Sequence, residues 1–167
     1  KVYFPRLTVP VANIITNMLR YFIQYIIFLV FYFVFLLKGA PVTSNWMIAL
    51  TPLLLIYMAL LSLGYGLWIS AVTTKYRDLN FALPFVVQLW MYATPVVYPL
   101  SLIPDKFKLV MALNPMVPVI EIFRKAYLGT GTINLLHTGL SIALTFIILF
   151  TGIIIFNKTE KTFMDTV

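Results

Sequence analysis

The sequence predicts an all-α integral membrane protein with four transmembrane helices and two further short amphipathic helices. The first observation is the composition, because 62% of the 167 residues are hydrophobic and 10% are charged, whereas soluble domains carry about 25% charged residues. The second is the length of the apolar runs, since about 20 residues are needed to cross a hydrocarbon core about 30 Å thick. Four such runs lie at about residues 9–37, 46–72, 79–98 and 133–156.

Polar and small residues inside the first two runs carry further expectations. Arg20 stands beside the densest apolar part of the first run, so we expect it near a membrane interface or facing a polar cavity. In the second run Ser62, Gly66 and Ser70 recur every four residues. This spacing predicts a face on which another helix can approach closely, although small residues are also common in membrane helices without such a role.

A short charged link, Lys75-Tyr76-Arg77-Asp78, separates the second and third runs. It holds three of the 17 charged residues of the chain, which has 12 basic and 5 acidic side chains. Asp78 or Asn80 is placed to cap the helix that follows. With four crossings, the link lies on the same side of the membrane as both ends of the chain, and the distribution of basic residues favours the cytoplasmic side.

Residues 104–128 predict two short helices, because Pro104 and Pro118 each stand where a helix can begin. The two helices are joined at Asn114-Pro115. After Pro118 the apolar side chains share one helix face. The opposite face carries Glu121, Arg124 and Lys125. Helices this short and this charged do not span, so we expect them at the interface or dipping in from one side.

The residue inventory argues against several classes of function. The net charge of +7 comes from scattered basic residues with no polar face to form a nucleic-acid groove. No G-x-x-x-x-G-K-[ST] loop is present to bind ATP. A lone His137 indicates neither a metal site nor a catalytic triad. The acidic residues lie outside the apolar runs, which disfavours an ion-coupled carrier and points to an energy source in a partner.

Aromatic side chains crowd the first run and allow two interpretations. They can contact lipid and pack against helices, which is the favoured reading for most of them, or they can line a path for sugars, whose apolar ring faces stack on aromatic rings. Tyr21, Tyr25 and Tyr32 share one broad helix face. Together with Arg20, these tyrosines are the candidates for a pathway lining.

Three stretches of the chain resemble the ABC-2 type permeases that export bacterial polysaccharides, a group that includes O-antigen, capsule and teichoic acid export permeases. They are "KVYFPRLTVP" at 1–10, "GLWISAVTTKYRDLNFALPFVVQLWMYATPVVYPLSLIP" at 66–104 and "ALNPMVPVIEIFRKAYLG" at 112–129. The resemblance covers nearly the whole chain. Its K-Y-R-D, P-V-V-Y-P and L-N-P motifs are specific to this group.

The resemblance implies an architecture and a partner. The family has six membrane helices with both termini in the cytoplasm, so residues 1–167 correspond to one partial transmembrane domain that lacks the first two helices. Two permease subunits assemble with two cytoplasmic ATPase subunits in the bacterial inner membrane and move a lipid-linked glycan. ATP and Mg are bound by the ATPase, so the resemblance implies no cofactor, metal or catalytic residue in this chain.

The resemblance also implies roles for two groups of residues. The cytoplasmic loops that meet the ATPase correspond to Lys1, Arg6, Lys75, Tyr76, Arg77 and Asp78. For the link at 75–78 the alternative is a plain topology anchor. The short helices correspond to an external gate near the pathway exit. The candidate gate residues are Pro95, Tyr98, Pro99, Asn114, Pro115, Glu121 and Arg124. Glu121 and Arg124 are one helical turn apart and can pair.

Two alternatives remain open from the sequence. A membrane-embedded glycosyl- or acyl-transferase needs a catalytic acid, base or metal site, for which this chain has few ionisable residues. An ABC-2 permease for a drug or a lipid would share the fold but not the substrate. ATP-dependent translocation of a labelled glycolipid in vesicles distinguishes glycan export from a drug or lipid permease, whereas transferase activity without any ATPase would support the transferase.

Overall fold

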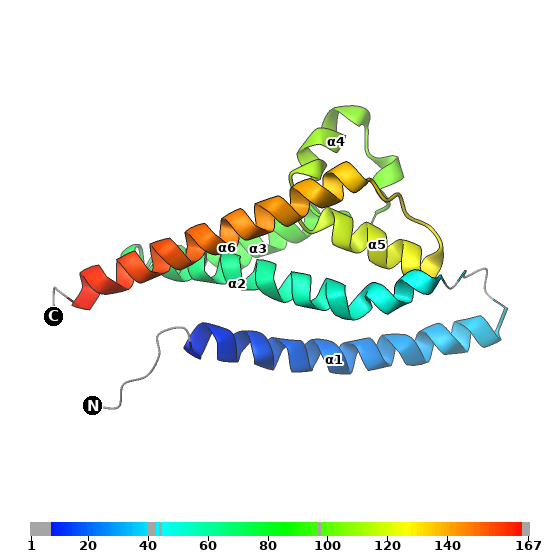
Figure 1. Cartoon of the computed structure of the whole chain (residues 1–167), viewed down its shortest axis with the longest axis horizontal. Helices are drawn as coiled ribbons and strands as arrows, with labels where there is room; N and C mark the ends of the chain where they lie inside the picture. The colour runs from blue at the N-terminus through cyan, green and yellow to red at the C-terminus, as the bar shows by residue number, and fades with distance from the viewer. Residues whose placement is uncertain (1–7, 40–42, 44, 97, 165–167) are drawn as a thin grey trace. The chain divides into compact units, whose positions relative to one another are not determined.

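The computed structural model describes residues 8–39, 43, 45–96 and 98–164, and within them every regular element is helical (Figure 1). The elements are α1 (Thr8–Leu37), η1 (Trp46–Leu50), α2 (Thr51–Lys75), α3 (Leu79–Tyr92), η2 (Leu100–Leu102), α4 (Asp105–Ala112), α5 (Val117–Leu128) and α6 (Leu135–Met164). The predicted all-α class is therefore confirmed. The chain forms two compact units, Lys1–Thr43 and Ser44–Val167, which are described separately.

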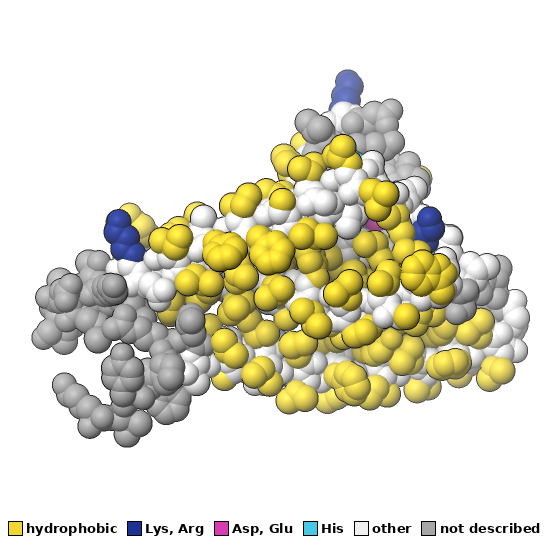
Figure 2. Space-filling view, viewed as in Figure 1, with side chains coloured by type: hydrophobic (Ala, Val, Ile, Leu, Met, Phe, Trp, Pro, Cys, Tyr) yellow, Lys and Arg dark blue, Asp and Glu magenta, His cyan; other side chains and the backbone are white. Residues whose placement is uncertain are grey.

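Three helical segments are long and apolar enough to cross a membrane. They are Thr8–Leu37, Trp46–Lys75 and Leu135–Thr159, with mean hydropathies of 2.0, 2.1 and 2.5. Apolar side chains cover the helices on the face shown in Figure 2, as expected of surfaces that meet lipid. The structure thus supports three spanning helices directly.

The fourth apolar helix, α3, is shorter than the run at 79–98 suggested. It contains 14 residues, about 21 Å at the usual helical rise. The helix ends at Tyr92, where the N–H groups of Ala93 and Thr94 turn back to the carbonyls of Leu89 and Met91. Pro95 explains the stop, because proline lacks the N–H that continues a helix and disfavours helical geometry in the residue before it.

Helices α2 and α6 pack with their backbones in close contact through two glycines. A Cβ at Gly64 would lie 3.0 Å from the backbone nitrogen of Leu149, and one at Gly152 would lie 2.9 Å from the carbonyl oxygen of Gly64. By contrast, a Cβ at Gly66 would meet nothing within 4 Å. The predicted small-residue face of α2 is therefore not the face that α6 contacts, because the partner glycine on α6 aligns with Gly64 instead.

Helix α5 is a buried helix of the second unit. Val117, Ala126 and Tyr127 are 4%, 1% and 1% exposed. Tyr127 also places its hydroxyl 2.9 Å from the hydroxyl of Thr51 on α2. Glu121, which the sequence places opposite the apolar face of this helix, is nevertheless buried, at 3% exposed. The next subsection shows which partners make the burial of this carboxylate possible.

Candidate functional site

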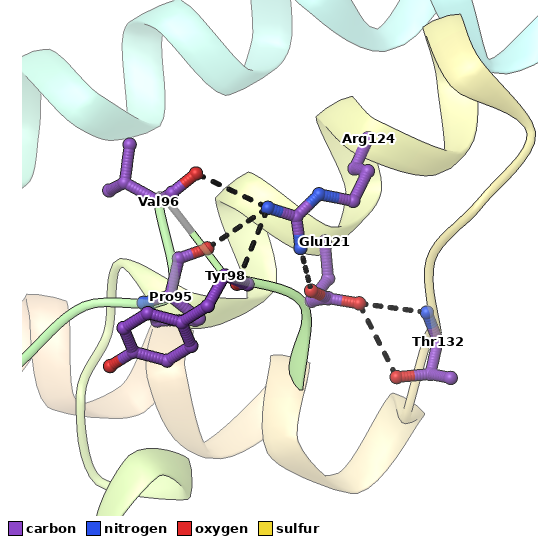
Figure 3. A network of polar contacts seen from close by, with 6 residues as sticks. All are labelled: Pro95, Val96, Tyr98, Glu121, Arg124 and Thr132. Carbon is purple, nitrogen blue, oxygen red and sulfur yellow. Dashed lines mark hydrogen bonds and ion pairs between the residues drawn. The ribbon is translucent and has the colours of Figure 1, made fainter. Parts of the chain in front are cut away.

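A buried ion pair on α5 joins three separate segments of the chain (Figure 3). Arg124 donates from Nη1 to Oε1 of Glu121 at 3.0 Å. Its Nη2 faces the segment after α3, where it lies 3.2 Å, 3.3 Å and 3.5 Å from three carbonyl oxygens. These belong to Pro95, Val96 and Tyr98. We call Glu121, Arg124, Thr132 and these three carbonyls the polar clamp.

The second carboxylate oxygen of Glu121 reaches the connection between α5 and α6. It accepts from the backbone N–H of Thr132 at 2.9 Å and lies 3.4 Å from the Thr132 hydroxyl. This connection comes so close to α5 that a Cβ at Gly131 would lie 2.7 Å from the Glu121 carbonyl oxygen. Glycine at 131 therefore permits the approach that satisfies the carboxylate.

Burial makes the pairing in the clamp obligatory. The Glu121 and Arg124 side chains are 5% and 16% exposed. A buried charge without a partner is strongly unfavourable, whereas charge-assisted hydrogen bonds offset much of the desolvation cost. The helical spacing predicted the ion pair itself, but not the burial or the carbonyl partners.

The joint between α4 and α5 is held by a second set of polar contacts. The Asn114 side chain donates from Nδ2 to the Thr94 hydroxyl at 2.9 Å and accepts from the backbone N–H of Met116 at 3.0 Å. Thr94 is 4% exposed and Pro95 is fully buried. The segment after α3 is thus fixed by the joint as well as by the clamp.

The carbonyl of Pro115 connects this joint to the two long helices of the second unit. It accepts from the Ser141 hydroxyl of α6 at 2.7 Å and lies 3.2 Å from the Tyr57 hydroxyl of α2. The Thr145 hydroxyl lies 2.7 Å from the Tyr57 hydroxyl. The contact between α2 and α6 therefore contains a cluster of hydroxyl groups, and this cluster holds the Pro115 carbonyl of the joint.

The predicted gate residues mostly belong to this connected network. Tyr98 adds a hydrogen bond from its hydroxyl to the Tyr92 carbonyl at 2.9 Å. Pro99 is exposed and lines a small cavity of about 90 Å³ beside Glu121 and Arg124. The sequence analysis did not single out Tyr57, Thr94, Thr132, Ser141 or Thr145. The sequence carries a signal for two of these residues. Ser141 and Thr145 are four positions apart in an apolar helix, where hydroxyl side chains tend to face other helices.

The charged link is a tight, exposed turn between α2 and α3. The Tyr76 N–H bonds to the Val72 carbonyl at 2.8 Å, and the Leu79 N–H bonds to the Tyr76 carbonyl at 3.2 Å. Lys75 and Arg77 are exposed, and the Lys75 Nζ lies 5.3 Å from the centre of the Tyr76 ring. These side chains are accessible to a partner.

Two expectations near the link have different outcomes. Asp78 occupies the N-cap position of α3, but its side chain makes no capping hydrogen bond, and its backbone is already helical at that position. Asp78 therefore stands at the predicted capping position, but its side chain does not make the predicted hydrogen bond. Lys1 and Arg6 lie outside the described residues.

In the first unit, the predicted tyrosine face of α1 forms a continuous row of rings. The centres of Tyr21 and Tyr25 are 6.1 Å apart, those of Tyr25 and Phe28 are 6.3 Å apart, and those of Phe28 and Tyr32 are 6.0 Å apart. Arg20 is exposed on the same helix. The sequence analysis had not included Phe28, which fills the spacing between the second and third tyrosines.

Long apolar helices joined by short polar links, with irregular backbone held by a partly buried arginine, define a multi-pass membrane protein. Residues 2–128 match the family model of the ABC-2 type transporter. The chain therefore belongs to the ABC-2 type transporter family.

Curated relatives narrow the comparison to export permeases. An O-antigen export system permease protein RfbA of Klebsiella pneumoniae is 26% identical over 165 residues, which cover 99% of this chain and 62% of the relative. A second RfbA of this species is 27% identical with the same coverage. An RfbA of Myxococcus xanthus is 29% identical over 76% of this chain and 48% of the relative. The chain thus spans about three fifths of the length of the Klebsiella relatives.

Proposed function

We propose that this chain is part of the permease subunit of an ATP-binding cassette exporter that moves a lipid-linked polysaccharide across the bacterial inner membrane. The polysaccharide would be of the O-antigen, capsule or teichoic acid type. The observation that carries the proposal is the match of 99% of the chain to O-antigen export permeases. The subunit itself is not an enzyme in this proposal.

The proposal includes four crossings in this chain, with α3 as the third. At about 21 Å, the helix of 14 residues needs the segment that follows it to complete a crossing. Irregular backbone at membrane depth is tolerated where protein satisfies its polar groups. Arg124 supports this reading, because its guanidinium lies within 3.5 Å of the three carbonyls after the helix. The remainder of the permease then supplies two more helices.

The energy for transport comes from a separate ATPase subunit in this proposal. ATP and Mg bind there, and the link at 75–78 is a contact between permease and ATPase. The exposure of Tyr76, at 56%, and of Arg77 supports this role. Lys1 and Arg6, which lie outside the described residues, are further proposed contacts of the ATPase. Two permease copies pair with two ATPase copies in the working assembly.

The polar clamp forms part of an external gate. The pair α4–α5 lies at the opposite end of α3 from the link, and the clamp holds the segment after α3 against α5. We place the ring row of α1, with Arg20, along the path of the glycan. Stacking of sugar faces on aromatic rings supports this placement.

The test is translocation by the full-length gene product in inverted membrane vesicles that contain its ATPase. We expect ATP-dependent movement of a fluorescent lipid-linked glycan, and none with an ATPase variant that binds but does not hydrolyse ATP. Movement of the lipid without its glycan at an equal rate would favour a lipid permease instead. Glycan or acyl transfer without the ATPase would contradict the proposal.

A further inference from the structure

An apolar groove runs between α2 and α3 beside the charged link. It encloses about 460 Å³ and is lined by α2, by the first turns of α3 and by one residue of α6. On α2 its walls include Trp68, Val72 and Thr73, and on α3 they include Leu79 and Ala82. A cavity of this size is in the range that holds a small-molecule ligand.

Two polar groups of the groove walls already have partners. The Thr73 hydroxyl donates to the Ile69 carbonyl at 2.8 Å, a bond inside α2. The Trp68 Nε1 donates to the Thr151 hydroxyl of α6 at 3.0 Å. Apart from the Tyr65 hydroxyl, what remains for a ligand is aliphatic and aromatic surface. The groove therefore suits an acyl chain.

The two ends of the groove differ in character. At one end the Tyr65 ring of α2 meets the Trp90 ring of α3 edge to face, with centres 5.9 Å apart. At the other end the groove reaches Thr73 and Leu79, which flank the link. From Tyr65 to Thr73 the groove extends about 12 Å along α2 at the usual helical rise.

The open end of the groove carries a positive charge. Lys75 follows Val72 by three residues and so lies on the same side of α2 as the groove wall. The link holds two cations, Lys75 and Arg77, and one anion, Asp78, which leaves a net charge of +1. A flexible lysine stem can lie along apolar surface while its ammonium group reaches the headgroup region.

We propose that the groove between α2 and α3 binds one acyl chain of an anionic glycerophospholipid, whose phosphate is held by Lys75. Apolar walls that end at an exposed ammonium group complement a ligand with a hydrocarbon chain and an anionic head. The inference goes beyond glycan transport and uses none of the clamp residues.

The test uses the full-length protein in nanodiscs of phosphatidylcholine with a minor fraction of phosphatidylglycerol that carries a diazirine in its acyl chain. After illumination, we expect labelled peptides from both walls of the groove, several-fold above the labelling by a matched phosphatidylcholine probe. Lys75→Gln should lower the phosphatidylglycerol signal to the phosphatidylcholine level. Ala82→Leu, which fills the groove, should lower labelling by both probes.

Matched controls separate this site from general lipid contact. Lys38→Gln removes another exposed lysine, which follows α1, and Ala143→Leu enlarges an exposed alanine on α6 outside the groove. Neither should change the labelling. Equal labelling by the two probes, or full labelling in Lys75→Gln, would overturn the proposal. It would also fail if a photo-crosslinker at Ala82 reacted with another segment of the protein instead of lipid. None of these readouts depends on transport.

Discussion

At the residue scale, the guanidinium of Arg124 connects α5 to the segment after α3. This one side chain pairs with Glu121 and faces three backbone carbonyls of the non-helical segment after α3. A lysine would supply the charge, but it lacks the planar guanidinium whose two terminal nitrogens donate in different directions. The identity of residue 124, and not only its charge, therefore matters for the segment after α3.

We expect the clamp to show strong coupling between its two charges. Removing one partner of a buried ion pair costs about 3–5 kcal/mol, and the 16% exposure of the Arg124 side chain puts our expectation at the lower end. Glu121→Gln and Arg124→Met should each lower the melting temperature of the purified full-length protein. Glu121→Gln combined with Arg124→Met should cost less than the sum of the two.

Lys125→Met is the matched control for this cycle, because it removes a neighbouring charge on α5 that takes no part in the clamp. Its melting temperature should stay close to that of the parent. Strictly additive losses in the double variant would contradict the direct pairing.

The role of the guanidinium at residue 124, as distinct from its positive charge, can be tested separately. Arg124→Lys should keep the pair with Glu121 but lose most of the contacts to the carbonyls of Pro95 and Val96. We expect faster proteolysis in the segment 93–104 with a smaller fall in melting temperature than for Arg124→Met. Unchanged cleavage in that segment would show that the carbonyl contacts contribute little.

At the element scale, close packing of α2 on α6 depends on which glycine faces which neighbour. Gly64 meets α6 backbone, whereas Gly66 stands two residues away with open space around it in this chain. Two residues are about 200° apart around a helix, so the two glycines face nearly opposite directions. Only the face of α2 that carries Gly64 therefore packs closely against α6.

Alanine substitutions should separate the two glycines. Gly64→Ala forces a methyl group against the backbone of Leu149, and overpacking of this kind typically costs about 1–3 kcal/mol. Gly66→Ala should be neutral or stabilising by up to about 1 kcal/mol, because alanine is the better helix former. Thermal unfolding of both variants of the full-length protein measures the difference. Equal destabilisation would mean that another helix packs on Gly66.

At the scale of the whole molecule, the class and the helix order could be predicted from apolar runs alone, since length and hydropathy decide what spans. Two features, the early end of α3 and the burial of Glu121, could not be predicted in this way. The early end of α3 depends on Pro95, whose effect competes with a run that stays apolar to Tyr98. The burial of Glu121 depends on Thr132 and on loop carbonyls distant in sequence, which no local pattern of α5 reveals.

The predicted ATPase contact belongs to this scale as well. A photo-crosslinker at Tyr76 in the full-length protein, expressed in its native cells, should yield an adduct with a P-loop ATPase. Arg77→Glu should weaken co-purification of that ATPase and leave membrane insertion intact, because the exposed link contributes little to folding. Lys38→Glu is the control, since Lys38 follows α1 and the proposed topology places it on the other side of the membrane from the link. Normal co-purification of Arg77→Glu would argue for a topology anchor.

The polar clamp also has a consequence for biosynthesis. The carbonyls of Pro95, Val96 and Tyr98 precede their guanidinium partner by 29, 28 and 26 residues, and Thr132 follows Glu121 by 11. When α3 emerges from the ribosome, the residues that supply these partners lie further along the chain and have not yet emerged. The carbonyls after α3 therefore need water or other donors until the residues up to Thr132 have emerged. Assembly of this end of the molecule is tied to the order in which the chain is made.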